Sequence, residues 1–146
     1  MEHYGFFDGD QEYGQDEFSR YFNNIFQSGI SIDENNNMTF RTYSDEANKI
    51  KVETGFAIIK GFFIYNDSLK VLDIPTNPNY DRIDRIVIRL NLNNKIVSIE
   101  RKEGAAASNP IAPDLQRDNL IYELSLAQLI ISNSGNINVI DERFRE

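Results

Sequence analysis

Residues 82–102 read RIDRIVIRLNLNNKIVSIERK, which is the clearest structural signal in the chain. Apolar and other side chains alternate along its first half with the two-residue period of a strand, placing on one side Ile86, Ile88, Leu90 and Leu92. Asn93-Asn94 suits a two-residue type I′ turn, because Asn tolerates positive φ. The segment therefore predicts an antiparallel hairpin that joins strand 83–92 to strand 95–102.

Short apolar runs separated by turn residues continue this pattern on both sides of the hairpin. We expect further strands at 38–43, 49–53, 56–59, 62–65, 68–74 and 137–140. In segment 68–74, Leu69 and Val71 are expected to face inward, with Leu72 as a further option. Residues 104–113 are small and proline-rich and predict a loop. Segment 120–132 is ambiguous, because its alternation favours a strand while its leucine spacing also fits a helix.

Residues 15–28 form the best helical pattern in the sequence. One face of that helix would carry Phe18, Phe22, Ile25, Phe26 and Gly29. Gly29 is expected to end the helix in a left-handed conformation. We interpret the apolar face as part of the chain's own core, with burial against a partner as the alternative. The predicted fold is mainly β, a β-sandwich-like domain with one N-terminal amphipathic helix.

Composition excludes several chemistries. The chain has 146 residues, no Cys, one His and a formal net charge of −8. It therefore lacks disulfides, thiol nucleophiles and sites built from Cys or paired His, and His3 is the only possible triad base. The negative charge argues against binding to nucleic acid or to anionic membranes. The start does not resemble a signal peptide, and no apolar run approaches the ~20 residues that span a bilayer. We expect no cofactor, no metal and no catalytic residue.

The first residues form a distinct acidic and aromatic segment. Six acids and no Lys or Arg occur within residues 1–18, and Gly residues interrupt any regular pattern. We interpret residues 1–14 as a docking arm, followed by an attachment domain at 15–146. The aromatic side chains Tyr4, Phe6 and Phe7 should pack on this domain or on a partner. The run at 8–12 resembles the start of a calcium loop, but the Gly and Glu that complete such loops are missing.

The predicted hairpin is net basic, in contrast to the acidic residues 1–18. Residues 82–102 hold six bases against two acids. We favour a solvent-facing side of the hairpin, with an anion-binding face or pairing with the acidic arm as alternatives. A further interpretation is that Arg82, Asp84 and Arg85 hold the preceding loop. The aromatic residues at 56, 62, 63 and 65 are interpreted as core rather than as a sugar-stacking surface. Paired carboxylates among Asp73, Asp81 and Asp84 would be needed for a glycosidase, and turn formation is the simpler interpretation.

The order of several segments matches a known group of proteins. These segments are YGFFD at 4–8, DEFSRYF at 16–22, GFAII at 55–59, GFFI at 61–64, RIDRIVIRL at 82–90, SNPIAP at 108–113, YELSLAQ at 122–128 and IDERF at 140–144. In this order the chain resembles structural tail proteins of phages and prophages that infect Gram-positive bacteria. The members are baseplate or tail-tip proteins whose N-terminal domain docks on the tail.

The resemblance implies a virion component without enzymatic activity, made in the bacterial cytoplasm. It implies an attachment module or short adaptor that docks on other tail proteins, forms homo-oligomers, with a trimer favoured, and holds or joins the host-adsorption apparatus. The partner-binding residues that we predict are Tyr4, Phe6, Phe7, Phe18, Phe22, Arg85 and Arg89. The alternative function is a module that binds host cell-wall carbohydrate.

Overall fold

A computed structural model of the chain describes residues 1–144 and confirms a mainly β fold. Within these residues about 40% lie in strands and 8% in one helix near the N-terminus. The elements are α1 (Gln15–Ile25), β1 (Gly29–Ile30), β2 (Thr42–Tyr43), β3 (Lys49–Val52), β4 (Gly55–Ile59), β5 (Phe62–Asn66), β6 (Lys70–Asp73), β7 (Arg82–Asn91), β8 (Ile96–Lys102), β9 (Ile121–Ile131) and β10 (Ile137–Asp141).

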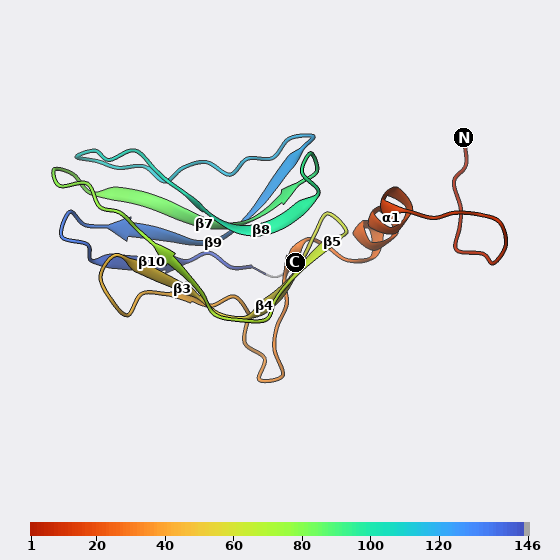
Figure 1. Cartoon of the computed structure of the whole chain (residues 1–146), viewed down its shortest axis with the longest axis horizontal. Helices are drawn as coiled ribbons and strands as arrows, with labels where there is room; N and C mark the ends of the chain where they lie inside the picture. Colours follow the sequence, from red (N-terminus) through yellow and green to blue (C-terminus); the bar gives the residue numbers. More distant parts are fainter. Residues whose placement is uncertain (145–146) are drawn as a thin grey trace.

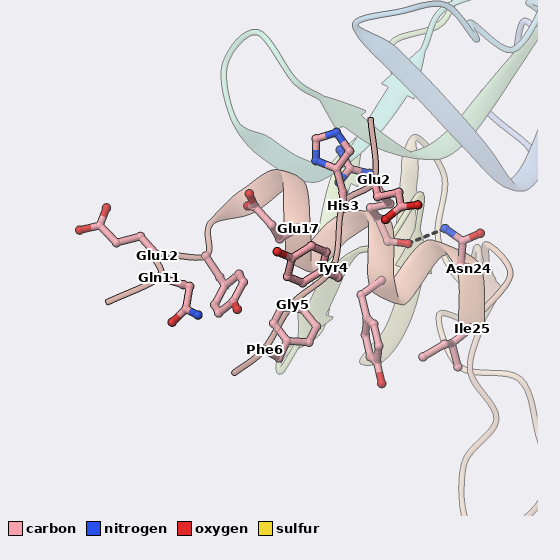
Figure 2. Close-up of a pocket in the computed structure, with 13 residues that line it drawn as sticks. Glu2, His3, Tyr4, Gly5, Phe6, Gln11, Glu12, Glu17, Asn24 and Ile25 are labelled. Atoms are coloured by element: carbon pink, nitrogen blue, oxygen red, sulfur yellow. Dashed lines mark hydrogen bonds between the residues drawn. The ribbon is translucent and has the colours of Figure 1, made fainter. Parts of the chain in front are cut away.

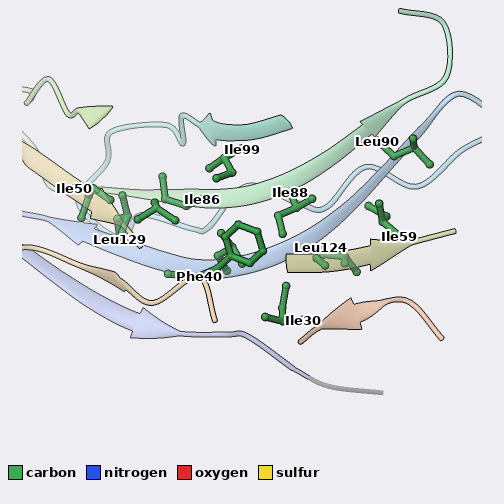
Figure 3. Packing of buried hydrophobic residues seen from close by; sticks show 14 of the residues in the cluster. Ile30, Phe40, Ile50, Ile59, Ile86, Ile88, Leu90, Ile99, Leu124 and Leu129 are labelled. Carbon is green, nitrogen blue, oxygen red and sulfur yellow. The ribbon is translucent and has the colours of Figure 1, made fainter. Parts of the chain in front are cut away.

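Three antiparallel sheets enclose one core, which gives the predicted sandwich-like arrangement (Figure 1). A four-stranded sheet has the order β10-β9-β7-β8, and two three-stranded sheets have the orders β1-β4-β5 and β2-β3-β6. The core cluster takes side chains from all three sheets, as Figure 3 shows for Ile50 and Ile59 together with Ile86, Ile88 and Leu124. The hydrophobic effect therefore holds the large sheet to the two small ones.

The predicted hairpin is confirmed, but its turn differs. Strands β7 and β8 pair from Arg85↔Lys102 to Asn91↔Ile96, so residues 92–95 form a four-residue connection. Among these four residues only Lys95 has positive φ, at 57°. A type I′ turn at Asn93-Asn94 was therefore the wrong prediction, because it requires positive φ at both central residues. The side chain of Asn91 stabilises the longer turn instead by accepting a hydrogen bond from the backbone N–H of Asn94 at 3.1 Å.

Segment 120–132 is a strand, and its mixed pattern comes from a β-bulge. The pairing of β7 with β9 shifts between Ile86↔Ala127 and Val87↔Ser125, which leaves Leu126 as an extra residue. Side-chain parity changes at such a bulge, so Leu124 and Leu129 both reach the core although an odd number of positions separates them. This change of parity produces the leucine spacing that also fits a helix.

The inward face of β6 differs from the prediction. Leu69 and Val71 are each 48% exposed, whereas Leu72 packs against the core. The register explains the difference, because β3 and β6 pair Ile50 directly with Leu72 and Ile50 is fully buried. Directly opposed residues lie on the same face of a sheet, so the neighbours of Leu72 point outward.

The helix also differs from the prediction at its end and on its apolar face. It ends at Ile25, Phe26 is extended, and Gly29 has no positive φ but pairs with Ile58 in the sheet. The chain leaves the helix in an extended conformation because it must enter β1 within four residues. None of the residues of α1 is buried, so the interpretation of its apolar face as core is wrong. The helix lies outside the sandwich, at one end of the molecule (Figure 1).

Candidate interaction site

The turn between β4 and β5 holds the helix on the sandwich. Lys60 and Gly61 connect the paired residues Ile59 and Phe62, and both have positive φ, at 51° and 83°, as a type I′ turn requires. The carbonyl oxygen of Ser19 in α1 occupies the space where a Cβ of residue 61 would lie. The N–H of Lys60 donates to Oγ of Ser28 at 2.9 Å, which fixes the segment after the helix.

A methyl group at this turn is expected to displace the helix while leaving the sandwich folded. In the Gly61→Ala variant the new Cβ would overlap the Ser19 carbonyl oxygen. We expect limited proteolysis to cleave between residues 25 and 30 faster than in the parent protein. Gly135→Ala is the matched control, because Gly135 also has positive φ, at 92°, but contacts the Asn48 side chain. Each variant should lose about 1 kcal/mol of stability from the left-handed backbone, and equal cleavage in both would contradict this role of Gly61.

The N-terminal arm folds back on the helix through Phe6 (Figure 2). The Phe6 ring stacks on Phe18 at 5.2 Å and meets Tyr13 and Tyr21 edge-on at 5.2 and 5.0 Å. The backbone N–H of Phe7 donates to the Tyr13 hydroxyl at 3.1 Å. Such aromatic pairs contribute about 0.5–1.5 kcal/mol each beyond the area that they bury. The arm therefore packs on this domain in part, as one of the two predicted alternatives requires.

Most of the aromatic surface of the arm and helix nevertheless stays exposed. We call this surface the aromatic face and define it by Tyr4, Phe6, Phe7, Phe18, Tyr21, Phe22, Ile25 and Phe26. Each of these side chains is at least 41% exposed. A hollow of about 750 Å³ lies between the arm and the helix. A contiguous apolar patch of this kind is typical of an interaction surface. It contains the five arm and helix residues that the sequence predicts for partner binding.

Unpaired carboxylates accompany the aromatic face in the sequence, and three of them, Glu2, Glu12 and Glu17, line its hollow together with Arg20. The acids are Glu2, Asp8, Asp10, Glu12, Asp16 and Glu17, all exposed, and within residues 1–144 none of them forms an ion pair. A hydrogen bond from the N–H of Gly14, at 2.9 Å, lowers the pKa of Glu17 and keeps it charged at the start of the helix. The only Lys or Arg before residue 41 is Arg20. This end of the molecule is thus both apolar and negative.

The two basic hairpin residues predicted for partner binding pair within the chain rather than facing solvent. Arg85 contacts Glu142 at 2.6 Å, Arg89 contacts Glu123 at 2.7 Å, and their side chains are only 13% and 27% exposed. The solvent-facing interpretation is therefore wrong for these two residues, and their bonds do not involve the acidic arm. Their predicted role in partner binding stays a prediction, although the guanidinium groups are already engaged.

The charged residues instead hold two loops against the sandwich. Arg82 donates to the carbonyl oxygen of Pro75 at 2.6 Å, which confirms that it holds the loop before its strand. Arg85 was predicted to hold the same loop, but it donates instead to the carbonyl oxygen of Pro113, after the hairpin, at 2.9 Å. Segment 103–120 runs over the outer face of the large sheet and is fixed there by such bonds. Val87 points to this outer face and is nevertheless fully buried, which agrees with segment 103–120 covering it.

Glu123 is the centre of this outer network and was missed as a key residue. Its fully buried carboxylate accepts bonds from Lys102 and Arg89, each at 2.7 Å, and from the N–H of Gln116 at 2.6 Å. Burial alone raises the pKa of Glu123. The three donors together lower this pKa by a larger amount, so it lies below the ordinary value. The available sequence signal was an acid at position 123 within an apolar strand. Such an acid needs buried partners.

A second exposed aromatic surface lies on β4 and β5. Phe56, Phe63 and Tyr65 are 37%, 65% and 68% exposed, and the rings of Phe56 and Phe63 stack at 5.8 Å. The interpretation of these three residues as core is wrong, whereas Phe62 does pack against the core. A hollow of about 450 Å³, lined partly by Phe26 and Phe56, lies between this surface and the end of the helix.

The three acids considered for a glycosidase site each form structural bonds. Asp73 pairs with Lys49, Asp81 accepts a bond from the N–H of Asn133, and Asp84 is buried in an ion pair. Within residues 1–144 no group of three or more His, Cys, Asp or Glu side chains could hold a metal, and no helix is long and apolar enough to cross a membrane.

The chain matched no protein-family model, no curated protein and no solved structure.

Proposed function

We propose that this chain is an assembly module of a phage tail, a baseplate or tail-tip protein that docks on other tail proteins through its N-terminal arm and helix. The observation that carries the proposal is the exposed aromatic face at the end of the molecule. The resemblance in the order of sequence segments supplies the phage context. On this proposal the protein is a non-enzymatic virion component that binds neither nucleic acid nor membrane, and it forms homo-oligomers, with a trimer favoured.

The size of the aromatic face supports a protein partner. With ~200 Å² for one large apolar side chain, the exposed fractions of its eight residues correspond to about 850 Å² of accessible surface. A stable protein–protein interface buries roughly 800 Å² on each partner. Aromatic side chains are also the residues that most often dominate binding energy at such interfaces. The face is therefore large enough and of the right composition to form one complete interface.

Deletion of residues 1–14 is expected to leave a folded domain that fails to assemble. The reason is that the aromatic contacts of the arm outside itself are with Phe18 and Tyr21 of α1, whereas the core belongs to the sheets. Thermal unfolding would report the fold, and incorporation into tail particles would report assembly. A Phe63→Ser/Tyr65→Ser variant, which alters exposed aromatic residues outside the arm and helix, is the matched control. If the truncated protein unfolds, the arm belongs to the core and the proposed docking role is wrong.

Carbohydrate binding remains the second proposal because of the exposed aromatic residues on β4 and β5. Flat aromatic rings such as Phe63 and Tyr65 could stack on sugar rings of a bacterial cell wall. Saturable binding to purified cell-wall polysaccharide would favour this function. That binding should be lost in Phe63→Ala/Tyr65→Ala and kept after deletion of residues 1–14, since the two surfaces use different residues.

A further inference from the structure

We infer that the aromatic face binds a different protein, one that presents an apolar surface flanked by Lys and Arg side chains, and not a second copy of this chain. The inference rests on the proposed function, because it takes the aromatic face as the docking surface. It adds the chemistry of the partner, which follows from the charges that accompany the face and from the use of the basic residues elsewhere in the chain.

Three acids, Glu2, Glu12 and Glu17, line the hollow of the aromatic face, and we call these and the other acids of residues 1–18 the acidic rim. The acidic rim thus comprises six exposed acids, against the single base Arg20. No Lys or Arg within residues 1–144 forms an ion pair with these acids. Complementary charges at the rim of an interface speed association and exclude wrong partners. The best partner therefore combines an apolar centre with a basic rim.

A second copy of the chain offers few free bases, and the exposed one among the sheets that forms neither an ion pair nor a cation–π contact within residues 1–144 is Lys95, in the turn between β7 and β8. In the part of the chain that the structure describes, nine bases already pair with carboxylates, namely Arg41, Lys49, Lys51, Arg82, Arg85, Arg89, Arg101, Lys102 and Arg143. Two more, Lys60 and Arg117, lie over the Tyr122 ring at 4.5 and 4.6 Å. Lys70 donates to the carbonyl oxygen of Ile99 at 3.2 Å. Two aromatic faces placed against each other would also bring their acidic rims together, and like charges repel.

The test uses the full chain and two synthetic amphipathic helices of equal length as probes. One peptide carries Leu on one face and Lys on the other, and the second carries Glu in place of Lys. Fluorescence anisotropy of the labelled peptides would give the Kd of each. We expect binding to the Leu–Lys peptide that weakens with added salt, because salt screens exposed charges. We also expect no binding to the Leu–Glu peptide, and loss of Leu–Lys binding in Phe18→Ser/Phe22→Ser.

A pair of charge-matched variants separates the acidic rim from the general acidity of the protein. Asp8→Asn/Asp10→Asn/Glu12→Gln removes three charges from the arm. Glu34→Gln/Glu46→Gln/Asp67→Asn removes three exposed charges of the sandwich that form no ion pair within residues 1–144. The arm variant should bind the Leu–Lys peptide about tenfold more weakly, as expected for three exposed charge pairs. The sandwich variant should bind it like the parent.

Three results would overturn the inference. They are equal binding of both peptides, equal weakening by both triple variants, and reversible self-association in sedimentation equilibrium that Phe18→Ser/Phe22→Ser abolishes. The last result would make a second copy the occupant of the aromatic face. Failure of the proposed function is distinguishable, because in that case the protein without residues 1–14 would still assemble. If that protein fails to assemble while the peptides show no charge preference, the inferred partner alone is wrong.

Discussion

Glu123→Gln is expected to lower the free energy of unfolding by about 3 kcal/mol, which is typical of a broken buried ion pair. The change leaves Arg89 and Lys102 without their shared counter-ion on the outer face of the large sheet. The side chains of these two residues keep 27% and 18% exposure, so we expect the lower end of the usual range. The N–H of Gln116 would keep an acceptor, since an amide oxygen can take that bond.

Urea unfolding at pH 7 of the variant and the parent measures this loss. Glu53→Gln is the matched control, because Glu53 pairs with Arg41 at 3.2 Å but is 45% exposed. An exposed pair contributes only about 0–1 kcal/mol. Equal losses in the two variants would show that burial adds nothing to the Glu123 network.

The effect of Glu123 should also depend on pH, with a definite sign. Its pKa is lower in the folded chain than the ordinary value of 4.5. A carboxyl group of this kind stabilises the fold fully above its unfolded pKa, and the contribution disappears as pH falls through the folded pKa. The difference in stability between the parent and Glu123→Gln should therefore be constant near neutrality and shrink below pH ~4.5. A difference that grows on acidification would contradict this assignment.

Local pattern predicted the elements of the fold well and their register poorly. The alternation of Ile86, Ile88 and Leu90 depends only on neighbouring residues and on the period of a strand, so the hairpin was predictable. The inward face of β6 depends on which residue of β3 lies opposite Leu72. The bulge beside Leu126 likewise depends on the pairing of two strands far apart in the sequence. Such pairings are set by tertiary packing, which a local pattern does not contain.

In the candidate site, too, features set by local pattern were predictable and features set by tertiary contacts were not. The aromatic arm was predictable because Tyr4, Phe6 and Phe7 occur in a segment without a regular pattern, where apolar side chains need some other cover. Exposure of the helix face was not predictable, since an amphipathic period is the same whether the chain or a partner covers it. The engagement of Arg85 was also hidden, because its acidic partner Glu142 lies 57 positions further along the chain.

Asp84→Asn is the second substitution expected to be severe, with a loss of about 3–5 kcal/mol. Asp84 lies on the core side of β7 in line with Ile86 and is fully buried. Its carboxylate accepts two bonds from Arg82 at 2.7 and 2.9 Å, one from Arg101 at 2.8 Å and one from the N–H of Gly104 at 3.0 Å. These four hydrogen bonds all end on the Asp84 carboxylate, and each of its two oxygens accepts two of them.

An asparagine amide cannot replace this arrangement, because its NH₂ group would face the N–H donors of a guanidinium. Arg82, whose side chain is only 6% exposed, would then keep only the half-exposed Glu103, at 3.2 Å, as a carboxylate partner. Little relaxation is available nearby, because the carbonyl oxygen of Ile83 fills the space beside Gly104. Thermal and urea unfolding would measure the loss. Arg82→Met/Asp84→Leu should recover much of it if the unpaired charge is its cause. No recovery in the double variant would instead assign the loss to the bonds that Asp84 makes with Arg101 and Gly104.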